Sequence, residues 1–258
     1  MSRSDRSLSG VDIDSSVVHS ARRYNYWLGG TDNFPVDRES GDAIASRFPS
    51  VPLAARENRK FLGRAVRYLS GRGVRQFLDI GTGIPSAGPV HEIAPDARVV
   101  YVDHDPLVLA HAQKLLTGTT AYLHGDLREP DPILAGARDT LDFTQPIGLM
   151  LIAVLHFAKD HDQPLHHVST LVEALPPGSW LAVTNATLDF AAPADAADAR
   201  RMLGHEMEWR SAAELGRFFD GLELVEPGIV PVSDWHPDGE LRPAPAEVSS
   251  YGAVGRKP

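Results

Sequence analysis

The chain contains no cysteine among its 258 residues. This absence excludes disulfide bonds, a thiolate nucleophile, and cysteine-ligated zinc or iron–sulfur clusters. It is consistent with the reducing cytoplasm, where we expect the protein to be located. No apolar run approaches the roughly 18 residues of a membrane-spanning helix, so we expect no membrane partner.

Positive charge is also scarce: 25 lysines and arginines stand against 34 aspartates and glutamates, for a net charge of −9. Binding phosphates needs clustered basic side chains, so this balance argues against a nucleic-acid partner. The sequence has no Walker loop, no Gly-x-Ser-x-Gly elbow and no His-Glu-x-x-His motif. His166 and His167 are adjacent on a predicted helix and point apart, so we expect no metal site.

What the chain does contain is a glycine turn between two apolar strands. A strand predicted at Gln76–Ile80 runs into Gly81-Thr82-Gly83, and a second strand at Arg98–Asp103 ends in a carboxylate. Glycines allow a tight turn and the close approach of a ligand, and such a carboxylate can accept both hydroxyls of a ribose. This pair of features predicts a nucleoside-binding α/β sheet.

The residue before the first glycine, Asp79, indicates which nucleotide binds. A carboxylate there repels the pyrophosphate of a dinucleotide, whereas it attracts the sulfonium and ammonium groups of S-adenosylmethionine. The third glycine of the dinucleotide fingerprint is also missing, because Ser86 stands in its place and Pro85 interrupts the series. The turn therefore favours S-adenosylmethionine, with NAD as the alternative.

Strands and helices alternate along the rest of the chain. Further strands are predicted at Thr120–Leu123, Ile147–Ala153, Trp180–Asn185, Leu222–Val230 and Tyr251–Gly255. No helix separates the last two, so they should pair antiparallel. We predict an α/β protein with the Rossmann-like class I methyltransferase fold: a seven-stranded, mostly parallel sheet with an antiparallel last strand.

Three regions divide the chain. Residues 1–13 are rich in serine and arginine without an apolar core, which predicts a disordered leader and not a signal peptide. Residues 14–73 have a helical pattern and form a predicted N-terminal helical extension. Residues 74–258 form the predicted cofactor-binding domain, with a surface insertion at Phe190–Arg200 where such sheets often build a lid.

Four segments resemble one protein family, the actinobacterial S-adenosylmethionine-dependent methyltransferase-like proteins formerly described as a domain of unknown function. The segments are Arg23–Phe34, Asp79–Pro85, Tyr101–Pro106 and Ala153–Phe157. The resemblance covers nearly the whole chain. It implies the methyltransferase fold and a site for S-adenosylmethionine, but it does not supply a methyl acceptor.

The resemblance also implies where the cofactor binds. It puts Asp79, Gly81 and Gly83 around the methionine part and Asp103 on the ribose, and we count Thr82 between the glycines as a cofactor-binding residue. His104 would lie beside the adenine. After the third strand, Asp126 and Leu127 match the position that usually contacts the adenine amino group, although a routine turn is the alternative for them.

The aromatic segment near the N-terminus has two interpretations. Tyr24 could cover the adenosine or contact the sulfonium, and Asp32 or Asn33 could bind the amino acid end of the cofactor. Alternatively, Tyr24, Tyr26 and Trp27 pack their helix onto the domain.

Methyl transfer needs alignment more than a base, so a missing base motif would prove little. His156, just after the fourth strand, is the best candidate for a catalytic residue, and Asn185 ends the fifth strand nearby. A hydrogen-bonded structural histidine is the alternative. The sequence lacks the Asn/Asp-Pro-Pro-Tyr/Phe motif of amino-directed nucleic-acid methyltransferases, which also favours a small-molecule acceptor.

The sequence therefore predicts an S-adenosylmethionine-dependent methyltransferase that acts on a small molecule. Two alternatives remain open: a regulatory or interaction protein that binds the cofactor without transferring its methyl group, and an NAD-dependent oxidoreductase.

Overall fold

The computed structural model describes residues 14–84, 88–105, 107–108, 119–239 and 241–258. The disordered leader predicted for residues 1–13 lies outside the described residues, and so do Pro85 and Ser86.

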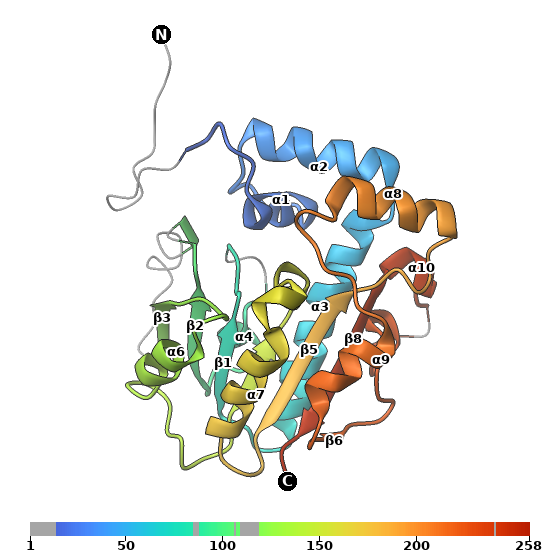
Figure 1. The fold of residues 1–258 in the computed structure, drawn as a ribbon. Helices are drawn as coiled ribbons and strands as arrows, with labels where there is room; N and C mark the ends of the chain where they lie inside the picture. Colours follow the sequence, from blue (N-terminus) through green and yellow to red (C-terminus); the bar gives the residue numbers. More distant parts are fainter. Residues whose placement is uncertain (1–13, 85–87, 106, 109–118, 240) are drawn as a thin grey trace.

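An eight-stranded sheet runs through the molecule (Figure 1). Its strand order is β3-β2-β1-β4-β5-β8-β6, and β7 pairs with β8. Strands β1 to β5 are parallel, whereas β8 is antiparallel to β5, β6 and β7. The strands are β1 (Gln76–Ile80), β2 (Arg98–Asp103), β3 (Thr120–His124), β4 (Gly148–Leu151), β5 (Trp180–Ala186), β6 (Glu223–Leu224), β7 (Val230–Pro231) and β8 (Ser250–Arg256).

This topology confirms the predicted mostly parallel sheet with an antiparallel last strand, but the predicted count of seven strands is wrong. The segment predicted as one strand at Leu222–Val230 forms the two short strands β6 and β7. Pro227 lacks an amide hydrogen for the ladder, and Gly228 has a φ of 85°. The chain therefore turns away from β8 between the two strands.

Helices cover both faces of the sheet (Figure 1). One face carries α3 (Val51–Gly71), α4 (Val90–Ile93) and α10 (Pro245–Val248), and the other carries α6 (Pro130–Ala137), α7 (Pro164–Ala174) and α9 (Ala212–Gly216).

The long helix α3 has the apolar spacing of a buried helix. Leu62, Val66 and Leu69 recur three to four residues apart, and with Phe61 they pack in one cluster that includes Phe77 of β1. The helix thus shares a core with the sheet. The division between a helical extension of residues 14–73 and a domain of residues 74–258 stays a prediction.

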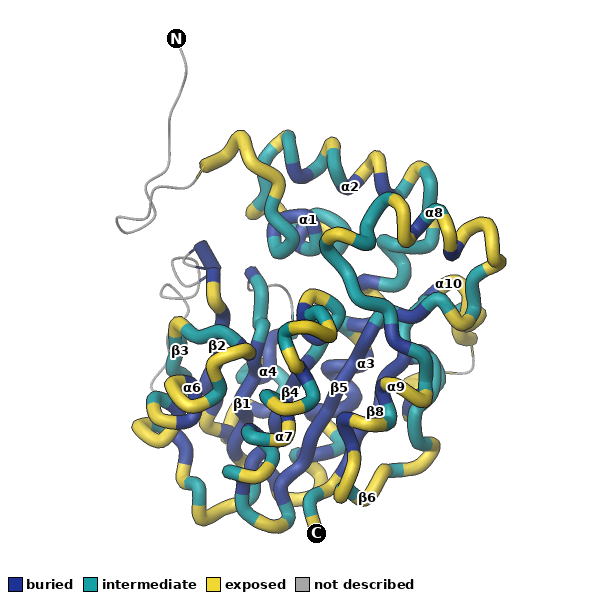
Figure 2. The backbone as a smooth tube through the Cα atoms, viewed as in Figure 1, coloured by how far each residue is buried: buried dark blue, intermediate teal, exposed yellow. Residues whose placement is uncertain are grey.

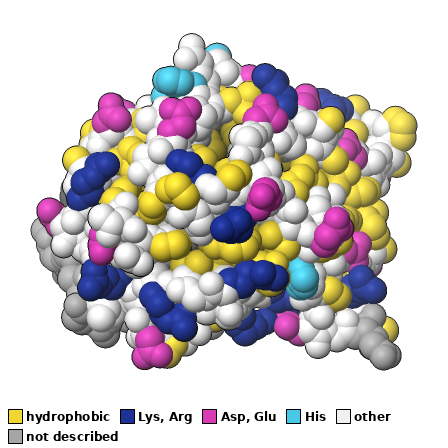
Figure 3. All heavy atoms as spheres, turned by 90° about the horizontal axis from the view of Figure 1, so that it is seen from below, with side chains coloured by type: hydrophobic (Ala, Val, Ile, Leu, Met, Phe, Trp, Pro, Cys, Tyr) yellow, Lys and Arg dark blue, Asp and Glu magenta, His cyan; other side chains and the backbone are white. Residues whose placement is uncertain are grey.

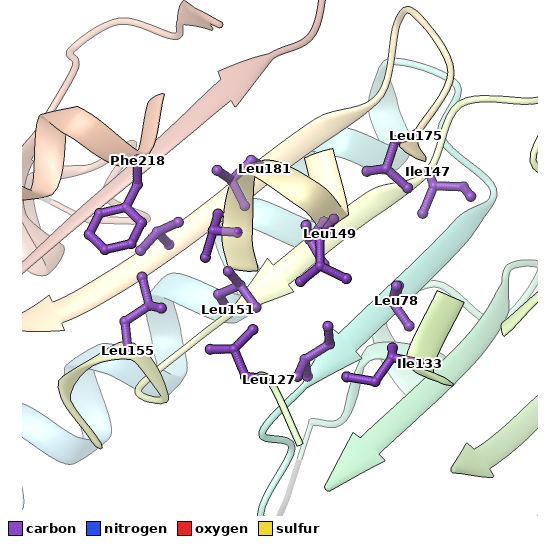
Figure 4. Close-up of a cluster of buried hydrophobic side chains, with 14 of the residues drawn as sticks. Leu78, Leu127, Ile133, Ile147, Leu149, Leu151, Leu155, Leu175, Leu181 and Phe218 are labelled. Atoms are coloured by element: carbon purple, nitrogen blue, oxygen red, sulfur yellow. The ribbon is translucent and has the colours of Figure 1, made fainter. Parts of the chain in front are cut away.

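A second core lies on the opposite face of the sheet. Leu78, Leu149 and Leu181 of the central strands pack there against helical residues such as Ile133 and Phe218 (Figure 4). Since helices cover both faces, β1, β4 and β5 are buried along nearly their whole length (Figure 2).

Three helices lie above the carboxyl ends of the parallel strands (Figure 1). They are α1 (Ser20–Trp27), α2 (Pro35–Arg47) and α8 (Pro193–Leu203), which we call the roof helices. The insertion predicted at Phe190–Arg200 forms most of α8.

Ion pairs join the roof helices to one another. Arg47 at the end of α2 contacts Asp195 of α8 at 2.9 Å and also pairs with Asp198. Arg23 of α1 pairs with Glu206, just after α8, at 2.5 Å. Segments far apart in the sequence are thereby held together above the sheet.

At the opposite end of the molecule, basic, acidic and apolar side chains are interspersed on the surface (Figure 3). Such mixing is typical of a solvated surface. Among the described residues, no helix is both long enough and apolar enough to cross a membrane.

Gly252 of β8 faces the ring of Phe61 in α3. A Cβ at position 252 would lie 2.7 Å from Cε2 of Phe61, which is fully buried and has no room to move. We expect Gly252→Ala to lower the free energy of unfolding by about 1–3 kcal/mol, measured by urea denaturation. Gly71→Ala is the control, because a Cβ at position 71 meets nothing within 4 Å. Equal losses in the two variants would contradict this tight contact.

Candidate functional site

A cavity of about 750 Å³ lies between the roof helices and the carboxyl ends of β1, β2, β4 and β5. Small-molecule sites commonly have about 300–1,000 Å³, and open α/β sheets bind ligands at this edge. Eight of the residues predicted from the sequence line the cavity: Tyr24, Asp79, Gly81, Thr82, Gly83, Asp103, His104 and His156.

The glycine turn after β1 is hydrogen-bonded to the end of β2. The amide of Gly81 donates to the carbonyl of Val102 at 2.8 Å, and that of Gly83 donates to Oδ2 of Asp103 at 2.8 Å. Gly81 has a φ of 74°, and a Cβ there would lie 2.4 Å from Cγ2 of Val154. Only glycine fits this position, where the loops after β1 and β4 meet.

Asp103 links the turn to the loop that follows its own strand. Its Oδ1 accepts from the amide of Asp105 at 3.0 Å, while its Oδ2 accepts from Gly83. The carboxylate is buried yet reaches the cavity wall. His104 follows with a side chain that is 65% exposed, so its ring can move to meet a ligand.

Asp79 is only 4% exposed. Because side chains alternate along a strand, Asp79 faces the same side as Phe77, which is the side that α3 covers. Burial raises the pKa of its carboxyl to about 7; Arg59 of α3 opposes this rise and Asp103 adds to it. A raised pKa means that the carboxylate form is under-stabilised, so a cationic ligand would gain from binding beside it.

Two cavity residues of α3, Asn58 and Arg59, were missed by sequence reasoning. Nδ2 of Asn58 donates to the hydroxyl of Tyr24 at 3.0 Å, and this hydroxyl donates to the carbonyl of Ala55 at 3.1 Å. Tyr24 therefore offers its ring, not its hydroxyl, to the cavity. One feature of the sequence could have indicated Asn58: it is a polar residue on the apolar face of a predicted helix, three positions before Phe61.

The segment after α1 forms a turn around the buried Asn25. Its Oδ1 accepts from the amide of Asp32 at 3.1 Å and from Nδ2 of Asn33 at 3.0 Å. Asn33 also donates to the carbonyl of Gly30 at 2.9 Å. Neither Asp32 nor Asn33 is among the described residues that line the cavity, so their cofactor contact stays a prediction.

Asp126 and Leu127 also lie outside the cavity lining. Arg128 donates to both oxygens of Asp126, at 2.9 and 2.5 Å, and these hydrogen bonds hold the pKa of that carboxyl below its ordinary value. Leu127 is buried in the core beside Ile133 (Figure 4). Their adenine contact stays a prediction.

His156 lines the cavity in the loop after β4. Burial lowers the pKa of its imidazole to about 3, and the charge of Arg210 lowers it further. The ring is therefore neutral near pH 7. Its Nδ1 has no hydrogen-bond partner in the part of the chain that the structure describes.

Arg210 orders the loop that carries His156. Its buried guanidinium donates to the carbonyls of Leu155 and Ala158, each at 2.8 Å, and to Oδ1 of Asn185 at 3.2 Å. The two carbonyls flank the histidine in the chain. No sequence motif marked Arg210, because it acts through tertiary contacts alone.

Beneath the roof helices the cavity wall is largely apolar, and we call this part the apolar chamber. Its side chains come from α1, from the end of α2, and from the segment around α8: Trp27, Ile44, Phe48, Leu188, Leu203 and Met207. Sequence reasoning missed them because apolar side chains on amphipathic helices predict ordinary packing.

The site suits S-adenosylmethionine on its own geometry. A buried carboxylate favours a cation at Asp79, positive-φ glycines allow close approach, and Asp103 reaches the wall where a ribose would lie. The apolar chamber leaves room for a second molecule.

A family model described as S-adenosyl methyltransferase matches residues 7–258. The chain belongs to this family. The protein is therefore an S-adenosylmethionine-dependent methyltransferase, and the preference for this cofactor over NAD is confirmed. No curated protein gives a significant match.

Two solved structures are similar over almost their whole length. A DUF574 family protein from Streptomyces avermitilis MA-4680 is 45% identical, with a TM-score of 0.89 over 95% of this chain and 99% of that one. A protein from Thermobifida fusca YX, assigned as a methyltransferase, is 38% identical, with a TM-score of 0.87 over 97% of both chains. Both support the predicted actinobacterial family.

A more distant structure shares the fold. The N-methyltransferase NodS from Bradyrhizobium japonicum WM9, in complex with S-adenosyl-L-homocysteine, is 18% identical. Its TM-score is 0.51 over 92% of this chain and 99% of that one.

Asp79→Asn should change how stability depends on pH. Between about pH 4 and 7 the native state keeps a proton on this carboxyl that the unfolded state releases. The free energy of unfolding of the wild-type protein therefore falls as the pH rises towards 7. The free energy of unfolding of the variant, relative to wild type, should rise by about 2–3 kcal/mol from about pH 5 to pH 8. Urea unfolding at both pH values measures this difference, and contributions from other groups cancel. A difference that does not change with pH would contradict the raised pKa.

Gly81→Ala and Gly83→Ala form a matched pair, because both glycines have positive φ. A Cβ at position 83 meets nothing within 4 Å, whereas one at position 81 collides with Val154. We expect Gly81→Ala to lose about 1–3 kcal/mol more unfolding free energy than Gly83→Ala in urea denaturation. A loss that is equal in both variants would mean that Val154 can move aside.

Proposed function

We propose that this methyltransferase acts on a small-molecule acceptor bound in the apolar chamber. One observation carries the proposal: a single cavity combines the glycine turn and Asp79 with the apolar wall beneath the roof helices. This arrangement would bring a small acceptor close to the cofactor. The net charge of −9 disfavours a nucleic acid as the alternative acceptor.

We assign the cofactor to the side of the cavity formed by β1 and β2. Asp79 would accept hydrogen bonds from the ammonium group, and Asp103 from the ribose hydroxyls. His104 would lie beside the adenine, and the ring of Tyr24 would cover part of the cofactor. Arg59 lies close enough to lower the pKa of Asp79, which suits a role beside the carboxylate end of the methionine part.

When bound, the cofactor supplies an electrophilic methyl group. The residues of the chain then have to align the acceptor and exclude water, which can account for much of the rate. A neutral His156 would accept a hydrogen bond from an O–H or N–H of the acceptor. With a pKa of about 3 it is a weak base, so its contribution would be orientation. Arg210 would maintain this orientation through the carbonyls of Leu155 and Ala158.

Calorimetric titration with S-adenosylmethionine, S-adenosyl-L-homocysteine and NAD tests the proposed binding side. The first two should bind and NAD should not. Asp79→Ala and Asp103→Ala should each weaken binding of S-adenosylmethionine at least tenfold, about 1.4 kcal/mol, because each removes a buried charged partner.

Asp139→Ala is the matched control, since this exposed carboxylate follows α6 and does not line the cavity. It should leave the affinity unchanged. Affinity that is also unchanged in both Asp79→Ala and Asp103→Ala would refute the assigned binding side.

A further inference from the structure

The side of α8 that faces the cavity has a regular pattern. Asp195, Ala199 and Leu203 are spaced four residues apart and all line the cavity, so one face of this helix forms part of the wall. Ile44 and Phe48, at the end of α2, line the same cavity. The pairing of Arg47 with Asp195 and Asp198 holds these two walls together.

Aromatic rings contribute to the same chamber. Trp27 of α1 lines it, and its Nε1 donates to the carbonyl of Gly41 at 3.4 Å, so its hydrogen-bonding group is already occupied. Phe48 lines it as well, and Trp209 lines the same cavity. Large flat side chains of this kind offer broad apolar contact to a flat ligand.

Most charged groups on the cavity wall already have partners: Arg47 pairs with Asp195, and Asp103 accepts hydrogen bonds from two backbone amides. Apart from histidines and Tyr24, the ionisable lining residues that the structure describes are four carboxylates and two arginines: Asp79, Asp103, Asp195, Glu206, Arg23 and Arg59. Arg23 already pairs with Glu206, and Arg59 lies near Asp79. An anionic ligand would therefore lose its hydration among apolar groups, while the basic side chains among these described residues already have acidic partners, which is strongly unfavourable.

We propose that the apolar chamber binds neutral aromatic small molecules and excludes their carboxylate analogues. This inference rests on the proposed function. It specifies the chemical class of the small-molecule acceptor. Shape and the apolar wall select the aromatic ring, and the cost of removing water from a carboxylate at this wall rejects the anion. Leu203 is a specificity-determining residue in this assignment, because it lies on the cavity face of α8.

The test uses two probes of matched shape, 2-naphthol and 2-naphthoate. Each is titrated calorimetrically into the full-length protein saturated with S-adenosyl-L-homocysteine, near pH 7.5. We expect 2-naphthol to bind at least tenfold more tightly than 2-naphthoate. Leu203→Asp should weaken 2-naphthol binding at least tenfold and leave the affinity for S-adenosyl-L-homocysteine unchanged.

Met202→Asp is the matched control, because it introduces the same aspartate at the neighbouring position, which does not line the cavity. It should retain 2-naphthol binding. Should Leu203→Asp fail to fold by circular dichroism, Leu188→Asp replaces it, with the same expectation, because Leu188 lines the cavity from the segment between β5 and α8.

The outcomes separate this inference from the proposed function. If S-adenosyl-L-homocysteine binds but 2-naphthol does not, or if 2-naphthoate binds equally well, the inference is wrong and the cofactor site stands. The inference is also wrong if Leu203→Asp and Met202→Asp behave alike. If the wild-type protein does not bind S-adenosyl-L-homocysteine, the proposed function fails, and this inference fails with it.

Discussion

The buried carboxyl of Asp79 lies at the edge where five parallel strands end, and the site depends on its incomplete charge compensation. Taking a carboxylate out of water is costly unless a partner replaces the lost hydration. Arg59 provides part of that compensation, yet the pKa of Asp79 stays at about 7. A cationic ligand would supply the remainder. The two glycines of the adjacent turn have no side chains that would block such a ligand. The hydrogen bonds of this turn to Val102 and Asp103 fix its backbone conformation.

The roof helices turn an open sheet edge into an enclosed site. They join parts of the chain that are far apart, since Arg47 and Asp195 are separated by 148 residues and Arg23 and Glu206 by 183. Partly exposed ion pairs of this kind contribute at most about 1 kcal/mol each. Their main effect is therefore to set the relative position of helices whose apolar side chains line one cavity. This arrangement encloses the apolar chamber next to the cofactor side.

Sequence and structure agree best where local pattern and tertiary environment coincide. The predicted boundaries of β1 and β2 are correct. A strand that is buried on both faces consists mainly of apolar residues, so its end is marked in the sequence by a turn or a polar residue. The prediction at Leu222–Val230 is wrong because strand propensity there is interrupted by Pro227 and Gly228. The position of Asp126 after the third strand predicted a ligand contact. In the structure, the side chain of Arg128 donates to both of its carboxylate oxygens.

The sequence by itself determined the strand-turn-strand unit, the carboxylates at its two strand ends, the preference for S-adenosylmethionine and the family. These features are local, so their chemistry can be read from residues that are adjacent or regularly spaced. Only the tertiary structure decided that Arg59 lies near Asp79, that Arg210 orders the loop of His156, and that α2 and α8 enclose an apolar chamber. Each of these contacts joins residues far apart in the chain, and the pattern around each one is that of an ordinary amphipathic helix or loop. Long-range packing, which no local pattern encodes, brings them together.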